Sequence, residues 1–87
     1  DSVGHTLIIP KEHFKDLTSI DMKTLTHILD VAKSLKLRLE EKLNCDGLTL
    51  IQNNGLIQEV KHFHLHLKPY YKNKKDKSIE EVYELLK

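Results

Sequence analysis

Cysteine, proline, glycine and tryptophan are scarce in this sequence. Its 87 residues include one cysteine, two prolines, three glycines and no tryptophan. Because Cys45 is alone, no disulfide can form within the chain, which is compatible with a reducing compartment. The length allows one small domain over residues 1–87. Apolar residues make up 39% and charged residues 31%, which is ordinary for a globular chain and excludes extended disorder.

The chain also lacks a strong charge of either sign and any long hydrophobic run. The net charge of +1 gives no field that would indicate nucleic acid or a membrane surface as a partner. No apolar run approaches the ~20 residues of a membrane span. The first residues do not combine a basic segment with an apolar one, so no signal peptide is visible. We therefore predict a cytoplasmic protein with neither a nucleic-acid nor a membrane partner.

The strongest helical signal covers residues 21–43. Apolar residues recur there at three- and four-residue spacing, and no glycine or proline interrupts them. Asp21 is a suitable N-cap, because its carboxylate can accept from free N–H groups of the first turn. The segment from Asn44 to Gly47 is a typical stop signal. This pattern predicts one long amphipathic helix.

Three short stretches are typical of strands, namely 6–9, 48–52 and 61–69. Asn53, Asn54 and Gly55 form a turn between the second and third, so these two strands should pair antiparallel. Residues 78–86 begin with a capping box and predict a short closing helix. The fold class is therefore α+β, with an antiparallel sheet and one long and one short helix. Such a thin sheet suggests that the chain dimerises or lacks part of the domain.

The third strand carries three alternating histidines. In a strand, His62, His64 and His66 would share one face, while Phe63 and its apolar neighbours enter the core on the other. Such a row is open to three interpretations: a solvated face, a zinc site, or nucleophilic attack on phosphorus. Strand histidines two residues apart can share one zinc ion. A neutral imidazole is equally a good nucleophile and leaving group near neutral pH.

The surroundings of the histidines favour phosphorus chemistry over a metal. Asparagine amides at a glycine turn and the amide of Gln58 are anion and ribose contacts, whereas no acidic residue or cysteine is obviously spaced to complete a zinc shell. His5 precedes the first strand and could meet the histidine row across the sheet. For His13 and His27 we expect structural or exposed roles.

Four segments resemble the histidine triad (HIT) superfamily of nucleotide hydrolases and transferases. They are 4–13 (GHTLIIPKEH), 53–55 (NNG), 58–60 (QEV) and 62–67 (HFHLHL), with the long helix in the expected place. The resemblance spans the C-terminal portion of the family's usual domain and lacks the N-terminal strands. It implies a HIT-like fold and, commonly, a homodimer. It also implies hydrolysis at the α-phosphate of purine nucleotides, either as a phosphoramidase on AMP derivatives or as a dinucleoside polyphosphate hydrolase.

The same resemblance implies roles for four histidines. His64 matches the nucleophile, which would form a nucleotidyl-histidine that water then hydrolyses. His66 matches the residue that bonds the phosphate and assists the leaving group. His62 and His5 would orient groups around the nucleophile.

For the substrate, the resemblance implies contacts from Asn53 and Gln58 and from the backbone of Glu59 and Val60. It implies no cofactor, and no metal site in the part of the domain that this chain matches. The sequence departs from the family pattern at Lys68, where an apolar residue is usual, and in a short loop before Gln58. The short loop and the missing N-terminal portion lead to an alternative function, a nucleotide-binding or protein-interaction module with vestigial catalysis.

Overall fold

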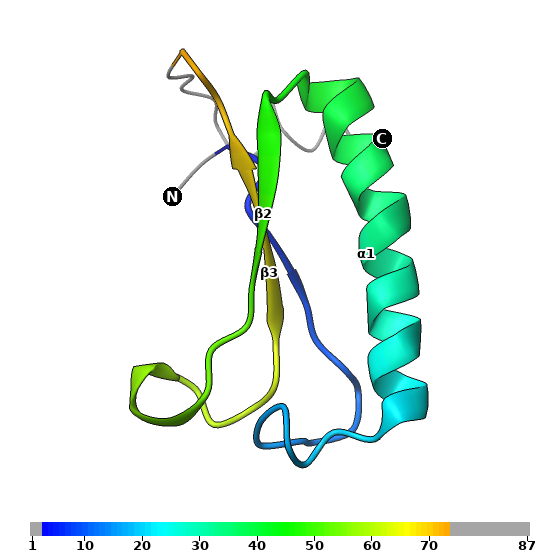
Figure 1. Ribbon diagram of the computed structural model, residues 1–87, viewed down its shortest axis with the longest axis vertical. Coiled ribbons are helices and arrows are strands. Elements are labelled where there is room, and N and C mark those ends of the chain that lie inside the picture. The colour runs from blue at the N-terminus through cyan, green and yellow to red at the C-terminus, as the bar shows by residue number, and fades with distance from the viewer. Residues whose placement is uncertain (1–2, 74–87) are drawn as a thin grey trace.

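The computed structural model describes residues 3–73, so the predicted short helix at 78–86 lies outside the described residues. Figure 1 shows one long helix lying beside a small twisted sheet. In chain order the elements are β1 (Thr6–Ile8), α1 (Met22–Leu43), β2 (Gly47–Ile51), the 3₁₀ turn η1 (Gly55–Ile57) and β3 (Leu65–Tyr70). The α+β class with an antiparallel sheet, predicted from the sequence, is confirmed.

The described residues form a three-stranded antiparallel sheet in the order β1-β3-β2. β3, which contains His66, is therefore the central strand. Its residue His66 lies opposite Leu7 of β1 and Ile51 of β2. Opposite residues in an antiparallel pair point to the same face, so these three side chains share one face of the sheet.

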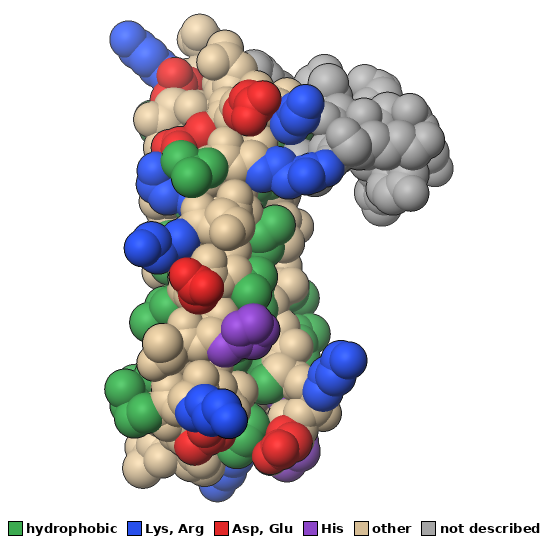
Figure 2. All heavy atoms as spheres, turned by 90° about the vertical axis from the view of Figure 1, so that its right-hand side faces the viewer, with side chains coloured by type: hydrophobic (Ala, Val, Ile, Leu, Met, Phe, Trp, Pro, Cys, Tyr) green, Lys and Arg blue, Asp and Glu red, His purple; other side chains and the backbone are tan. Residues whose placement is uncertain are grey.

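Both ends of α1 follow the sequence prediction. The Asp21 carboxylate accepts from the Thr24 N–H at 3.0 Å, and Asn44 closes the helix in the left-handed conformation with φ 52°. One side of α1 is buried and the opposite side carries positive and negative side chains among scattered apolar ones (Figure 2). Within residues 3–73, no helix combines the length and apolar character that crossing a membrane requires.

The hydrophobic core lies between α1 and one face of the sheet. Along residues 63–69 every second side chain is buried, and the intervening ones are half-buried. Phe63 and Leu67 are only 1% and 0% exposed, and they pack with Ile28, Ala32 and Leu39 of α1. The period-two pattern has thus separated an apolar face, covered by the helix, from a face that carries the histidines.

The regular part of the third strand is shorter than the predicted 61–69. β3 begins at Leu65, because the chain before it turns and bonds elsewhere. The His62 N–H donates to the Val60 carbonyl at 2.8 Å, and the Phe63 N–H donates to the Phe14 carbonyl at 2.6 Å. His62 therefore lies in the turn that leads into the strand and does not belong to a continuous row.

Candidate active site

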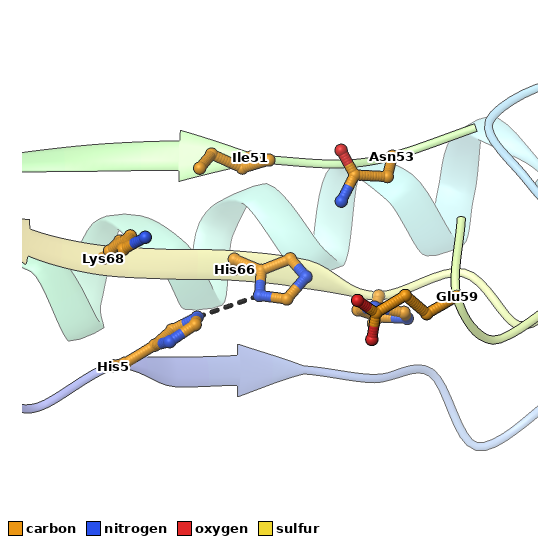
Figure 3. Close-up of a pocket in the computed structure, with 7 residues that line it drawn as sticks. His5, Ile51, Asn53, Glu59, His66 and Lys68 are labelled. Atoms are coloured by element: carbon orange, nitrogen blue, oxygen red, sulfur yellow. Dashed lines mark hydrogen bonds between the residues drawn. The ribbon is translucent and has the colours of Figure 1, made fainter. Parts of the chain in front are cut away.

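A cleft of about 360 Å³ opens on the sheet face opposite α1. It brings together residues from β2, from β3 and from the segments beside the strands, including His5 just before β1 (Figure 3). The residues that line it are His5, Ile51, Asn53, Glu59, His64, His66 and Lys68. Imidazoles, an amide and charged groups thus converge on one site.

The half-buried His64 is held in one tautomer by the backbone. Its Nδ1 lies 2.8 Å from the carbonyl oxygen of His62. Because a carbonyl only accepts, Nδ1 carries the proton and donates it. In the neutral ring the other nitrogen, Nε2, then keeps a free lone pair. This arrangement is suited to nucleophilic attack.

His66 and His5 form a pair of imidazoles across the sheet. His5 Nε2 lies 2.9 Å from His66 Nδ1, and the ring centroids are 5.1 Å apart. Burial lowers the pKa of both rings, and the positive charge of Lys68 adds to the effect. The hydrogen bond requires one donor and one acceptor, so it is compatible with at most one extra proton on the pair.

His62 is turned away from this cleft and toward the connection between β1 and α1. Its Nε2 lies 3.3 Å from the Pro10 carbonyl oxygen, and its Nδ1 lies 3.3 Å from Nδ1 of His13. The Pro10 carbonyl only accepts, so His62 donates to it through Nε2. In neutral His62, Nδ1 then accepts from His13. His62 therefore meets the cleft through its backbone carbonyl, which holds His64.

The four residues expected to contact substrate lie in different places. Asn53 and Glu59 line the cleft. Gln58 is 4% exposed and does not line the cleft, because its amide nitrogen is turned inward and donates to the Lys15 carbonyl. The Val60 side chain is 60% exposed and is also outside the lining.

Two lining residues, Lys68 and Ile51, were not among the site residues predicted from the sequence. Lys68 follows His66 by two residues, so strand alternation alone puts it on the histidine face. Ile51 lies opposite His66 in the register of β2 and β3. The register of β2 against β3 depends on the connection between them, which the sequence pattern does not specify. The place of Lys68, in contrast, follows from strand alternation.

A zinc site was the other chemical interpretation of the histidine row. Within residues 3–73, no three side chains of His, Cys, Asp or Glu are grouped so that they could hold a metal ion. The ring nitrogens of these histidines instead form hydrogen bonds with one another and with backbone carbonyl oxygens.

Comparison with known proteins gives one consistent result. The sequence model of the HIT domain matches residues 1–73. The chain is 42% identical over 95 residues to the uncharacterized HIT-like protein MG132 of Mycoplasma genitalium, covering 95% of this chain and 67% of that protein. It is 44% identical over 68 residues to adenosine 5'-monophosphoramidase HNT1 of Saccharomyces cerevisiae, covering 76% and 40% respectively.

Solved structures agree with these relatives. A zinc-bound histidine triad family protein from Mycobacterium smegmatis superimposes with a TM-score of 0.86 at 33% identity. That match covers 98% of this chain and 67% of the other. The chain thus spans about two thirds of the length of such relatives.

Proposed function

The chain belongs to the HIT domain family, and on that premise we propose that it hydrolyses AMP phosphoramidates through a nucleotidyl-histidine intermediate. One observation carries the proposal: the His62 carbonyl fixes the proton of His64 on Nδ1, 2.8 Å away, inside a cleft lined by imidazoles and an amide. The relative from Saccharomyces cerevisiae named adenosine 5'-monophosphoramidase supports the substrate class.

In the first step, the Nε2 lone pair of His64 attacks the α-phosphorus of the adenylated amine. The P–N bond to the amine breaks, and its electron pair stays on the amine nitrogen, which takes up a proton and leaves. His66 is the proposed proton donor, because its ring lies 4.8 Å from that of His64. His5, bonded to the other nitrogen of His66, would hold that ring in place.

In the second step, water attacks the phosphorus of the adenylyl-imidazole. The P–Nε2 bond breaks and its electron pair returns to His64, while the attacking water loses a proton to His66, which gave up its own proton in the first step. The products are AMP and the free amine. Asn53 is positioned to bond a phosphate or ribose oxygen, since its side chain lines the cleft. For Gln58 and Val60 only backbone contacts with the phosphate are proposed.

The experiment that tests this proposal is intact mass measurement after rapid mixing with an AMP phosphoramidate. Wild-type protein should show an added adenylyl group and release AMP. His64→Ala should show no adduct and lose at least about 10³-fold in kcat/KM, because the covalent route is gone. An equal adduct on His64→Ala would refute the assignment. AMP binding without adduct or turnover would favour a nucleotide-binding module.

We also propose that the protein acts as a homodimer. β2 is an edge strand among the described residues, and its Leu50 is 46% exposed. On α1, Leu29 and Leu37 are 45% and 66% exposed. A second copy of the chain would pair with the strand edge and cover these leucines. Light scattering should give twice the chain mass for wild-type protein and the single chain mass for Leu37→Glu.

A cytoplasmic location is part of the same proposal. The lone Cys45 suits a reducing compartment. Cell fractionation with an antibody against the chain tests it, and recovery in the membrane pellet would contradict it.

A further inference from the structure

The candidate active site has opposite charges at its two ends. Figure 3 shows Lys68 at one end, Glu59 at the other, and His66 between them. Glu59 is the one carboxylate among the residues that line the cleft. Its part in the resemblance was limited to its backbone, so the placement of its side chain in the cleft is information that only the structure supplies.

The Glu59 carboxylate is open to a ligand. The residue is exposed, and no hydrogen bond or ion pair engages its side chain among the described residues. It is also close enough to act on His66. Burial, the neighbouring imidazoles and Lys68 lower the pKa of His66, and the charge of Glu59 opposes them.

A negative group beside an anionic phosphate has a cost unless the substrate offers a compensating charge. A polyphosphate leaving group would bring further negative charge toward the carboxylate and would be repelled. A leaving amine that carries an ammonium group would be attracted. Specificity commonly rests on such paired attraction and repulsion.

We propose that Glu59 selects AMP phosphoramidates whose leaving amine carries a second, positively charged group, and disfavours anionic leaving groups such as polyphosphates. This inference rests on the proposed function and narrows its substrate class. Glu59 is then a specificity residue that contacts the leaving group, while the histidines carry the chemistry. Because the carboxylate is exposed, the preference should be modest, about two- to fivefold for each charge step.

Three matched substrates test the inference with the full chain. Each is AMP joined through nitrogen to a two-carbon linker that ends in an ammonium, a methyl or a carboxylate group. The wild-type kcat/KM should rank them in that order. In Glu59→Gln, which keeps the shape and removes the charge, the ranking should flatten. Glu41→Gln, an exposed site on α1, should keep the wild-type ranking.

Salt and binding measurements separate the possible outcomes. The preference should shrink at high ionic strength, because exposed charges are screened. Displacement of a fluorescent AMP analogue should give the same ranking of affinities without requiring turnover. Equal ranking in wild type and Glu59→Gln would overturn the inference. Loss of turnover on all three substrates, with the affinity ranking retained, would instead contradict the proposed function and leave the role of Glu59 standing.

Discussion

The two faces of β3 and its approach segment carry opposite kinds of side chain on one backbone. On the α1 side, Phe63 and Leu67 are buried almost completely. On the other side, His64 and His66 remain half-buried and bond through ring nitrogens to groups outside the core. The first face holds the strand in place, and the second uses that fixed strand to aim imidazoles. Stability and chemistry should therefore respond to different substitutions within the same few residues.

The largest effect on the comparison should come from Leu67→Ala. Leu67 is 0% exposed at the centre of the core, so its truncation removes buried apolar surface and leaves a cavity. We expect a loss of about 2–5 kcal/mol in the free energy of unfolding. Urea unfolding followed by circular dichroism measures it. His64→Ala, on the other face, should lose less than about 1 kcal/mol.

A larger loss of stability in His64→Ala than in Leu67→Ala would show that the two faces are not separate in function. The histidine would then be part of the structural core. Any activity lost in His64→Ala could in that case no longer be assigned to its lone pair.

His13→Ala should give the next largest effect, on turnover. His13 bonds the ring of His62, whose carbonyl in turn fixes the tautomer of His64. Loss of one hydrogen bond of about 1 kcal/mol should lower kcat about fivefold and leave KM nearly unchanged. His13→Asn, which offers an amide donor, should recover part of the rate. His27→Ala on α1 is the control, and equal losses in both alanine variants would contradict the link.

A pH titration sharpens the comparison on the histidine face. The pKa of His5 and of His66 is lowered by burial and by Lys68, so the unfolded chain takes up protons first as the pH falls. Stability contributed by the neutral rings is present above the ordinary histidine pKa of about 6.5 and is lost as the pH falls through it toward the lowered values. The urea concentration at the midpoint of unfolding should therefore decrease as the pH is lowered from 7.5 to 5.5.

The decline should be weaker in the His5→Gln, His66→Gln double variant, which removes both rings. It should persist in His27→Gln. A slope that is unchanged in the double variant would assign the pH dependence to groups other than His5 and His66.

Sequence periodicity was sufficient for elements whose side chains interact locally. The cap at Asp21, the long helix and the alternation after Phe63 all follow from near neighbours in the chain. The contacts of His13 and Gln58 could not be predicted, because both depend on the path of residues 9–20, which have no regular structure. His13 meets His62 across 49 positions, and Gln58 donates to a carbonyl 43 positions away. No periodic pattern carries that information.

The smallest expected effect belongs to Lys68→Leu, which places an apolar side chain on the histidine face of β3. Lys68 lines the cleft, and its charge lowers the pKa of His5 and His66. Removing that charge should raise both pKa values toward the ordinary one. It should also weaken phosphate binding, with KM for an AMP phosphoramidate rising about two- to fivefold at low salt and kcat little changed.

The salt dependence decides whether the charge or the shape of Lys68 matters. The KM difference between wild type and Lys68→Leu should narrow at high ionic strength, because screening removes the attraction that the substitution abolishes. Lys33→Leu changes the net charge equally, but Lys33 is an exposed residue of α1, the helix that covers the sheet face opposite the cleft. If Lys33→Leu raised KM as much as Lys68→Leu, the effect would come from the overall charge of the protein. The charge of Lys68 in the cleft would then have no specific role in phosphate binding.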